Sequence, residues 1–297
     1  MNLSYIGTFW DKHYKKLLWV TIIMLIIFGG VLGYSKYTTN EFIQKDFSLD
    51  GGLLITVQAE PTLSAADLET ELQQTLGGSI HVIELRSISS GGSNGYIVEL
   101  ESFDNDAALS AISSALGITL QDNYTIEEVS SELGQSFLQS TIKAILVAFI
   151  VMSIVVFVYF REFIPSMAVI LAGFSNLIGT LAIMNLLGMQ LSTAAVAALL
   201  MVLGYSVDTD ILLSTKVLKH TNEPLKERVY SSMKTGLTMQ ITAIIALAVL
   251  YALTPALLLK QIAAILIIGL LMDIPNTWIQ NAGIMRIYVE SKTGGTK

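Results

Sequence analysis

The sequence predicts an α-helical integral membrane protein with six transmembrane helices, plus an α+β ferredoxin-like domain between helices 1 and 2. Three observations predict this fold class. Of the 297 residues, 53% are hydrophobic and only 14% are charged, whereas soluble domains average about 25% charged residues. Six apolar segments are long enough to cross a bilayer. The stretch 36–134, in contrast, is polar and acidic.

Composition and motifs exclude several functions. Cysteine is absent, which excludes disulfides, thiolate metal sites and cysteine nucleophiles. The three histidines fall in separate regions and form no metal-ligand pair by spacing. Neither a G-x-x-x-x-G-K-[ST] phosphate loop nor an H-E-x-x-H zinc motif occurs. We therefore expect no cofactor, no bound metal and no direct use of ATP.

Residues 1–35 are expected to form a short cytoplasmic N-terminus and the first transmembrane helix. Basic residues precede the apolar run 17–34, as they would in a secretory signal. The run is longer than the usual signal core, and no A-x-A-like cleavage site follows it. The sequence therefore predicts an uncleaved helix.

Residues 36–134 are predicted to form an acidic extracytoplasmic domain, with sixteen acidic residues against three basic ones. Its segments read, in order, as a strand at 53–58, a helix at 64–76 capped by Ser64, strands at 80–88 and 95–101 joined by a hairpin at 90–94, a helix at 104–116 and a last strand at 118–120. This β-α-β-β-α-β order is typical of a ferredoxin-like sandwich. A domain this acidic is not expected to bind nucleic acid. Its negative charge is explained equally well as a means of keeping the domain soluble.

Residues 135–285 are predicted to hold five more transmembrane helices, followed by a cytoplasmic tail at 286–297. The spans lie near 138–160, 165–187, 191–215, 236–254 and 259–283. Twelve of the seventeen basic residues lie on the cytoplasmic side if the N-terminus is inside. The positive-inside rule therefore predicts a multi-pass protein of the cell membrane with both termini cytoplasmic.

Three carboxylates within apolar helices are the candidate site. A carboxylate inside a membrane-spanning helix is energetically costly and often marks an ion or proton path. Asp208 and Asp210 are separated by about 200° around one helix, so they cannot share a face. Asp273 lies at a similar depth in the last helix. We take Asp208 as the leading proton or ion relay with Lys234 as its counter-charge, and Asp210 and Asp273 as further members.

Several motifs resemble those of the SecD/SecF family of protein-export membrane proteins, in the archaeal form of its SecF branch. The residues that carry the resemblance are Asp46, Gly51 and Gly52 after the first helix, Gly204 and Tyr205 beside Asp208, Thr235 and Thr238 after Lys234, and Asn276 in the last helix. The resemblance covers nearly the whole chain, in the same order.

The resemblance implies one six-helix half of a transporter of the resistance-nodulation-division type. Such a subunit pairs with a SecD-type membrane protein, associates with the Sec translocation channel and is thought to use the proton gradient to help complete export of unfolded polypeptides. Whether the coupling ion is a proton or sodium stays open. Small residues are expected to leave a face free for the partner, namely Gly173, Gly179, Ala194, Ala195, Ala197 and Ala198.

Two positions depart from the family pattern. Bacterial SecF commonly carries its aspartate where this chain has Thr209, whereas Asp208 matches the SecD form of the motif. Lys234 replaces an arginine, and a buried lysine can lose its proton while arginine effectively cannot.

Two alternatives to a role in protein export stay open. One is a structural membrane subunit that works without a gradient and whose carboxylates never titrate. The other is an intramembrane aspartyl protease in which Asp208 and Asp273 share a proton, although the usual G-x-G-D context is missing. The family resemblance favours a subunit that is not an enzyme.

Overall fold

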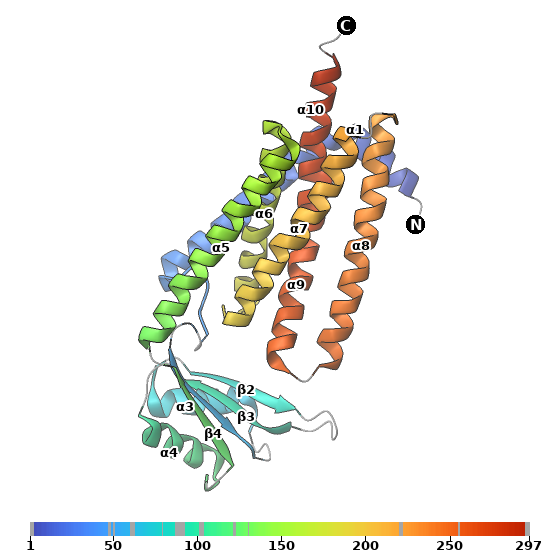
Figure 1. Cartoon of the computed structure of the whole chain (residues 1–297). Coiled ribbons are helices and arrows are strands. Elements are labelled where there is room, and N and C mark those ends of the chain that lie inside the picture. The colour runs from blue at the N-terminus through green and yellow to red at the C-terminus, as the bar shows by residue number, and fades with distance from the viewer. Residues whose placement is uncertain are drawn as a thin grey trace. The chain divides into compact units, whose positions relative to one another are not determined.

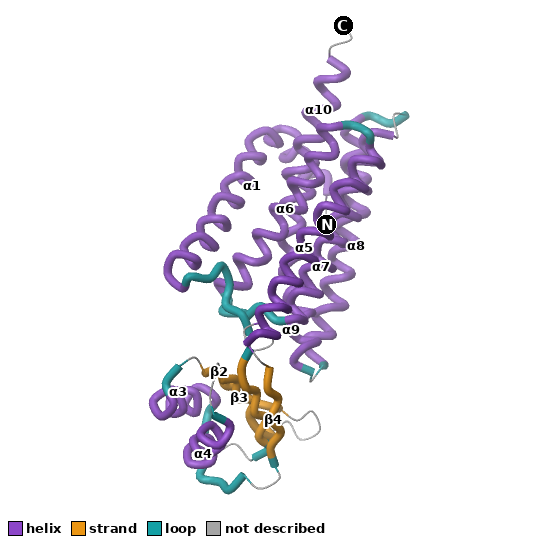
Figure 2. The backbone as a smooth tube through the Cα atoms, turned by 60° about the vertical axis from the view of Figure 1, so that its left-hand side comes forward, coloured by secondary structure: helices purple, strands orange, loops and turns teal. Residues whose placement is uncertain are grey.

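The computed structural model describes residues 3–46, 49, 51–59, 63–78, 80–86, 93–100, 104–120, 123–129, 131–219, 222–254 and 256–294. The chain divides into two compact units, each of which is drawn in Figure 1 and Figure 2. The first comprises Met1–Gln44, Ala144–Gln190 and Ala194–Lys297, and the second comprises Lys45–Lys143 with Leu191–Thr193.

The membrane-spanning part is built from helices. They are α1 (Leu3–Thr39), α5 (Ser131–Phe160), α6 (Phe163–Leu186), α7 (Thr193–Lys219), α8 (Leu225–Leu253), α9 (Leu257–Pro275), the π-helical turn η1 (Asn276–Asn281) and α10 (Ala282–Gly294). Six of the described segments are long and apolar enough to cross a membrane, with α9, η1 and α10 forming one of them. This confirms the six predicted spans.

The connection between the fourth and fifth spans was predicted at 216–235, and in the structure it is much shorter. Helix α7 continues to Lys219 and α8 already starts at Leu225. No glycine or proline interrupts the polar ends of these helices, so their backbone hydrogen bonds continue beyond the apolar part. Pro224 stands just before the first helical residue, where its missing N–H costs little.

The last span changes its backbone geometry at Pro275. Proline has no N–H to continue the α-helical hydrogen bonds, and α9 ends there. The next six residues form a π-helical turn, a feature often found at functional sites. Five side chains of this turn are buried: Asn276, Thr277, Trp278, Gln280 and Asn281.

The second unit contains a four-stranded antiparallel sheet in the order β2-β3-β1-β4. The elements are β1 (Gly52–Val57), α3 (Ala65–Leu76), β2 (Ile80–Arg86), β3 (Ser93–Leu100), α4 (Asn105–Leu116) and β4 (Tyr124–Val129). The chain order and the strand order together confirm the predicted ferredoxin-like α+β fold.

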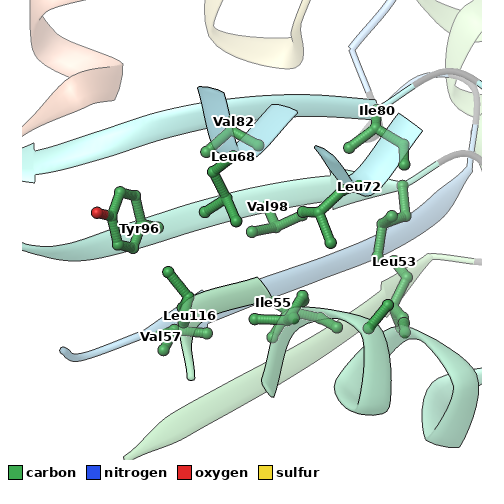
Figure 3. Close-up of a cluster of buried hydrophobic side chains, with 14 residues drawn as sticks. Leu53, Ile55, Val57, Leu68, Leu72, Ile80, Val82, Tyr96, Val98 and Leu116 are labelled. Carbon is green, nitrogen blue, oxygen red and sulfur yellow. The ribbon is translucent and has the colours of Figure 1, made fainter. Parts of the chain in front are cut away.

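The core of this domain lies between the sheet and its two helices. Every second residue of β1 points inward, because side chains alternate across a strand. Figure 3 shows Leu53, Ile55 and Val57 of β1 facing Leu68 of α3 and Leu116 of α4. All five are buried, so both helices cover the same face of the sheet.

Two predicted details of the domain are the last strand and the hairpin between β2 and β3. The last strand is wrong, because residues 118–120 form no strand and the fourth strand is Tyr124–Val129. Gly117 ends α4 in the left-handed conformation, and the N–H of Ile118 bonds to the carbonyl of Ser113, so the segment leaving the helix is held as a turn. The hairpin predicted at 90–94 lies mostly outside the described residues.

Candidate functional site

Polar side chains line the inner faces of α7 and of the last span. The buried set comprises Ser206, Thr209, Asp210 and Ser214 on α7, and Asp273, Asn276, Thr277, Gln280 and Asn281 on α9 and η1. Residues three and four apart share a helix face, and hydrogen bonds join the two faces directly. The bundle therefore contains a buried polar cluster between these helices.

Asp273 is the best-bonded acceptor of this cluster and is almost fully buried. Its Oδ1 accepts hydrogen bonds from Ser206 (2.5 Å), Thr277 (3.2 Å) and Asn176 (3.5 Å), and its Oδ2 accepts from Gln240 (2.6 Å) and Thr209 (2.8 Å). The donors come from α6, α7, α8 and η1. Hydrogen bonds to a carboxylate are stronger than those to a neutral group, so these contacts favour an ionised Asp273.

Asp210 is fully buried and has far fewer partners. The amide of Asn281 donates to its Oδ1 at 2.7 Å. Within the described chain, neither Oδ2 of Asp210 nor Oδ1 of Asn281 has a hydrogen-bond partner. Asp210 also lies close enough to Asp273 for their charges to repel each other.

Among the described residues, no buried positive side chain accompanies the two carboxyl groups. No lysine, arginine or histidine is among the buried side chains of the described residues. Removing an unpaired charge from water costs several kcal/mol, and a second like charge nearby adds to that cost. The pair therefore favours holding at least one proton or another small cation, and the poorly bonded Asp210 is the better place for it.

Helix α8 contributes a neutral amide to this cluster. Gln240 is buried; its Nε2 donates to Asp273, and its Oε1 accepts a hydrogen bond of 2.9 Å from Nε1 of Trp278. Gly236, one turn earlier, leaves room for the indole ring, because a Cβ there would lie only 2.2 Å from Cζ2 of Trp278.

Asp208 and Lys234 lie outside this cluster. Both side chains are exposed in the single chain, on α7 and α8 respectively. Across the described part of the chain, no ion pair joins them. The structure places Asp210, and not Asp208, on the buried face of α7 that meets Asp273. The cause is the helix geometry, since only one of two residues about 200° apart can face inward.

The motif residues around the first strand shape the entry into the domain. Gly51 and Gly52 have φ angles of 84° and 148°, a region where glycine is favoured. The N–H of Asp46 donates to the carbonyl of Leu191, and the carbonyl of Asp46 accepts from the N–H of Leu49. Residues 47, 48 and 50 of the same motif lie outside the described residues.

The remaining motif residues divide between the surface and the polar cluster. Gly204 and Tyr205 lie on the exposed face of α7 with Asp208. Thr235 and Thr238 are exposed on α8, and their hydroxyls bond to carbonyls one turn earlier in the same helix. Asn276, in contrast, is buried, and its Nδ2 has no partner among the described residues.

Most of the small residues expected to face a partner are used inside the bundle. Gly173, Gly179, Ala195 and Ala198 are buried, Ala194 is half-buried and Ala197 is exposed. A Cβ on Gly179 would lie 2.6 Å from Cε of Met272. These residues mainly allow α6 and α7 to pack closely within this chain, which corrects that expectation.

Sequence reasoning missed several members of the cluster, namely Ser206, Thr209, Gln240 and Asn281 as ligands of the carboxylates. A signal exists for Ser206 and Asn281, because 206, 210 and 214 are four residues apart, as are 273, 277 and 281. Such spacing marks one polar face per helix. Gln240 gives no such signal, since Thr235, Thr238 and Thr242 on the same helix face outward.

Comparisons with known proteins agree on one family. A family model for the C-terminal region of the protein export membrane proteins SecD/SecF matches residues 111–291. The protein-export membrane protein SecF of Methanocaldococcus jannaschii is 36% identical over 285 residues, covering 94% of this chain and 96% of that protein. SecF of Methanothermobacter thermautotrophicus is 40% identical, covering 92% of this chain and 90% of that protein.

A solved structure shows the same fold. The crystal structure of SecDF, a translocon-associated membrane protein from Thermus thermophilus, matches 94% of this chain with a TM-score of 0.72 and 19% sequence identity. A second SecDF structure, in a super-membrane-facing form, matches 96% with a TM-score of 0.62 and 19% identity. The chain covers only 38% and 39% of those two SecDF chains.

Proposed function

Because the chain belongs to the SecD/SecF family of protein-export membrane proteins, we propose that it uses a proton gradient, together with a SecD-type partner, to help complete translocation of unfolded polypeptides through the Sec channel. The role is that of a non-enzymatic subunit. Its relatives carry the name protein-export membrane protein SecF, and the SecDF chains of similar fold are more than twice as long as this one, which leaves room for a second, SecD-like half.

The observation that carries the proposal is the contrast between the two buried carboxyl groups. Asp273 accepts five hydrogen bonds. Asp210 accepts one from Asn281, has the hydroxyl of Thr277 as a second nearby donor, and leaves Oδ2 without a partner among the described residues. We propose that Asp210 binds and releases the coupling proton while Asp273 stays ionised. A proton on Asp210 removes the repulsion between the two groups.

Loading and unloading Asp210 changes the charge at the point where several helices meet. Asn281 of η1 holds Asp210, and donors on α6, α7 and α8 hold Asp273. When Asp210 is ionised, its repulsion of Asp273 favours a wider separation of α7 from the last span. This change in packing is the proposed link between the gradient and movement of the protein.

The proposal also includes an orientation and a partner face. Both termini lie in the cytoplasm and residues 36–134 lie outside, in accordance with the distribution of basic residues. Asp208 lies on an exposed face of α7, and a carboxylate facing lipid is unfavourable. A Cβ on nearby Gly204 would meet no atom within 4 Å, so a helix of the SecD-type partner can approach here and supply a hydrogen-bond donor.

Export in membrane vesicles tests the proposed relay. Asp210→Asn should keep the fold and the partner, because asparagine has the same shape, but should abolish the gradient-stimulated part of export. Asp210→Glu should keep some stimulation with an altered pH dependence. Export is measured with and without an imposed proton gradient and normalised to the protein present. Full stimulation of Asp210→Asn would reject the relay and favour a purely structural subunit.

A further inference from the structure

We infer that Gln240, held in a single orientation by Trp278, keeps the proton off Asp273 and thereby directs it to Asp210. The inference rests on the proposed function and assigns to these two residues a positioning role. It explains how two neighbouring carboxyl groups of the same chemical type can take different tasks.

The two hydrogen bonds of Gln240 fix the direction of its amide group. The indole N–H of Trp278 can only donate, so the atom of Gln240 that faces it at 2.9 Å must be the amide oxygen. The amide nitrogen then faces Oδ2 of Asp273 at 2.6 Å. Turning the amide over would bring its NH2 group against the indole N–H and its oxygen against the carboxylate, so both contacts would be lost.

The other donors to Asp273 are less firmly oriented than this amide. Ser206, Thr209 and Thr277 contact Asp273 through hydroxyl groups, which can rotate and accept a hydrogen bond instead of donating one. Asn176 is at 3.5 Å, and its own Oδ1 has no partner among the described residues. Gln240 is therefore the donor that cannot reverse its role when a proton arrives.

Oδ2 of Asp273 is the oxygen that the amide of Gln240 contacts. This oxygen accepts from Gln240 at 2.6 Å and from Thr209 at 2.8 Å. A proton on Oδ2 would have to displace one of these donors, and the fixed amide cannot turn to accept it. A proton on Oδ1 could be donated to a rotated hydroxyl, but Gln240 would then donate to a neutral carboxyl group, which is a weaker hydrogen bond. Oδ2 of Asp210 carries no such donor among the described residues, so protonating Asp210 breaks no hydrogen bond there.

The orientation also depends on Gly236. The indole ring of Trp278 lies against this residue, where a Cβ would be 2.2 Å from Cζ2 and 2.6 Å from Cη2. Gly236 and Gln240 are one turn apart on α8, so they share a face. A methyl group at Gly236 would push the ring away from Gln240 without touching either carboxylate.

Infrared spectroscopy of the complete chain with isotope-labelled aspartate tests the inference apart from export. In an Asp210→Asn background, Asp273 is the remaining aspartate of the buried cluster. While Trp278 holds Gln240 in place, Asp273 should give no infrared band of a protonated carboxyl group near neutral pH. Adding Trp278→Phe or Gly236→Ala should make that band appear and persist to a pH higher by about one unit, the effect of one lost hydrogen bond to a charged group.

Two controls make the result decisive. Gly29→Ala changes a glycine of α1 whose Cβ would meet no atom within 4 Å, and it should leave the spectrum unchanged. Asp273→Asn should remove the new band and so assign it. If Trp278→Phe and Gly236→Ala both leave Asp273 ionised like the parent, the inference is rejected. That result would be independent of the export assay, in which failure of the relay appears as gradient-stimulated export by Asp210→Asn.

Discussion

Asp208 and Asp210 stand two residues apart on α7, yet one is exposed and the other is fully buried. The exposed carboxylate faces away from the polar cluster, whereas the buried one is held by Asn281 and lies beside Asp273. One helix thus carries two acidic groups for which different tasks are expected, one toward a neighbouring protein and one inside the bundle.

A charge reversal at Asp208 should disturb the complex with the SecD-type partner. Asp208→Arg replaces an acceptor by a larger donor at a face where α7 has room for a close neighbour. We expect the partner to co-purify in clearly lower yield, while gradient-stimulated export per remaining complex stays near the parent value. Glu71→Arg, on the exposed surface of α3, should have no effect. A normal yield of complex for Asp208→Arg would show that the partner does not cover this face.

Asparagine should be tolerated much less well at position 273 than at 210. At Asp210, the replacing amide can still accept the one hydrogen bond from Asn281. At Asp273, one of the two oxygens becomes an NH2 group, which can no longer accept hydrogen bonds. Even with the remaining oxygen turned to Gln240, the donors on Oδ1, namely Asn176, Ser206 and Thr277, lose their acceptor. Each unsatisfied buried polar group costs about 1–3 kcal/mol. Thermal unfolding in detergent should therefore show a clearly lower midpoint for Asp273→Asn than for Asp210→Asn, and equal midpoints would contradict the hydrogen-bond assignment.

The absence of cysteine from the chain permits a clean test of orientation. Cysteine introduced at Gln74, exposed on α3, should react with an impermeant thiol reagent in intact cells. Cysteine at Asn222, exposed between α7 and α8, should react only after the membrane is opened. The parent chain serves as an unlabelled control. Labelling in the reverse pattern would overturn the orientation and, with it, the export proposal.

The sequence reveals the architecture more completely than the site. Apolar length predicts the six spans, and strand alternation with the Ser64 cap predicts most of the domain. Ser64 indeed accepts a hydrogen bond from the N–H of Asp67. The last strand was missed because the turn after Gly117 resembles a short apolar strand.

The site was predicted only in part, because its members are separated by up to about a hundred residues. Asp210 and Asp273 stand out as charges in apolar surroundings, but the choice between Asp208 and Asp210 depends on how α7 is rotated. That rotation is fixed by packing, for example of Val202 against Gly269. Gln240 joins the cluster through tertiary contacts that no local pattern indicates.

The last prediction concerns Glu99 in the sheet of the second unit. This half-buried side chain lies on β3, opposite Leu54 of β1 and His81 of β2. Burial, and then the nearby charge of Asp46, raise the pKa of Glu99 from 4.5 to about 7. His81, across the strand, lies 3.3 Å from Glu69 on α3. Glu99 therefore remains protonated at a pH where an unfolded chain would already have lost that proton.

This difference makes the domain less stable as the pH rises. Below about 4.5 the carboxyl group is protonated in both states, and its contribution is fully favourable. Between about 4.5 and 7 the unfolded chain ionises first, so the free energy of unfolding falls, by at most about 3 kcal/mol, and then levels off. Glu99→Gln removes the titrating group, so it should flatten this dependence and stabilise the sheet at pH values above about 7.

Amide hydrogen exchange of β1 and β3 in the full-length protein measures the effect, after correction for the intrinsic pH dependence of exchange. The matched control is Glu127→Gln, because Glu127 on β4 lies across from Leu54 in the same row of the sheet but is exposed. The control should keep the pH dependence of the parent, because it leaves the half-buried carboxyl group of Glu99 in place. If Glu99→Gln and Glu127→Gln gave the same protection at every pH, burial of Glu99 would not be the cause.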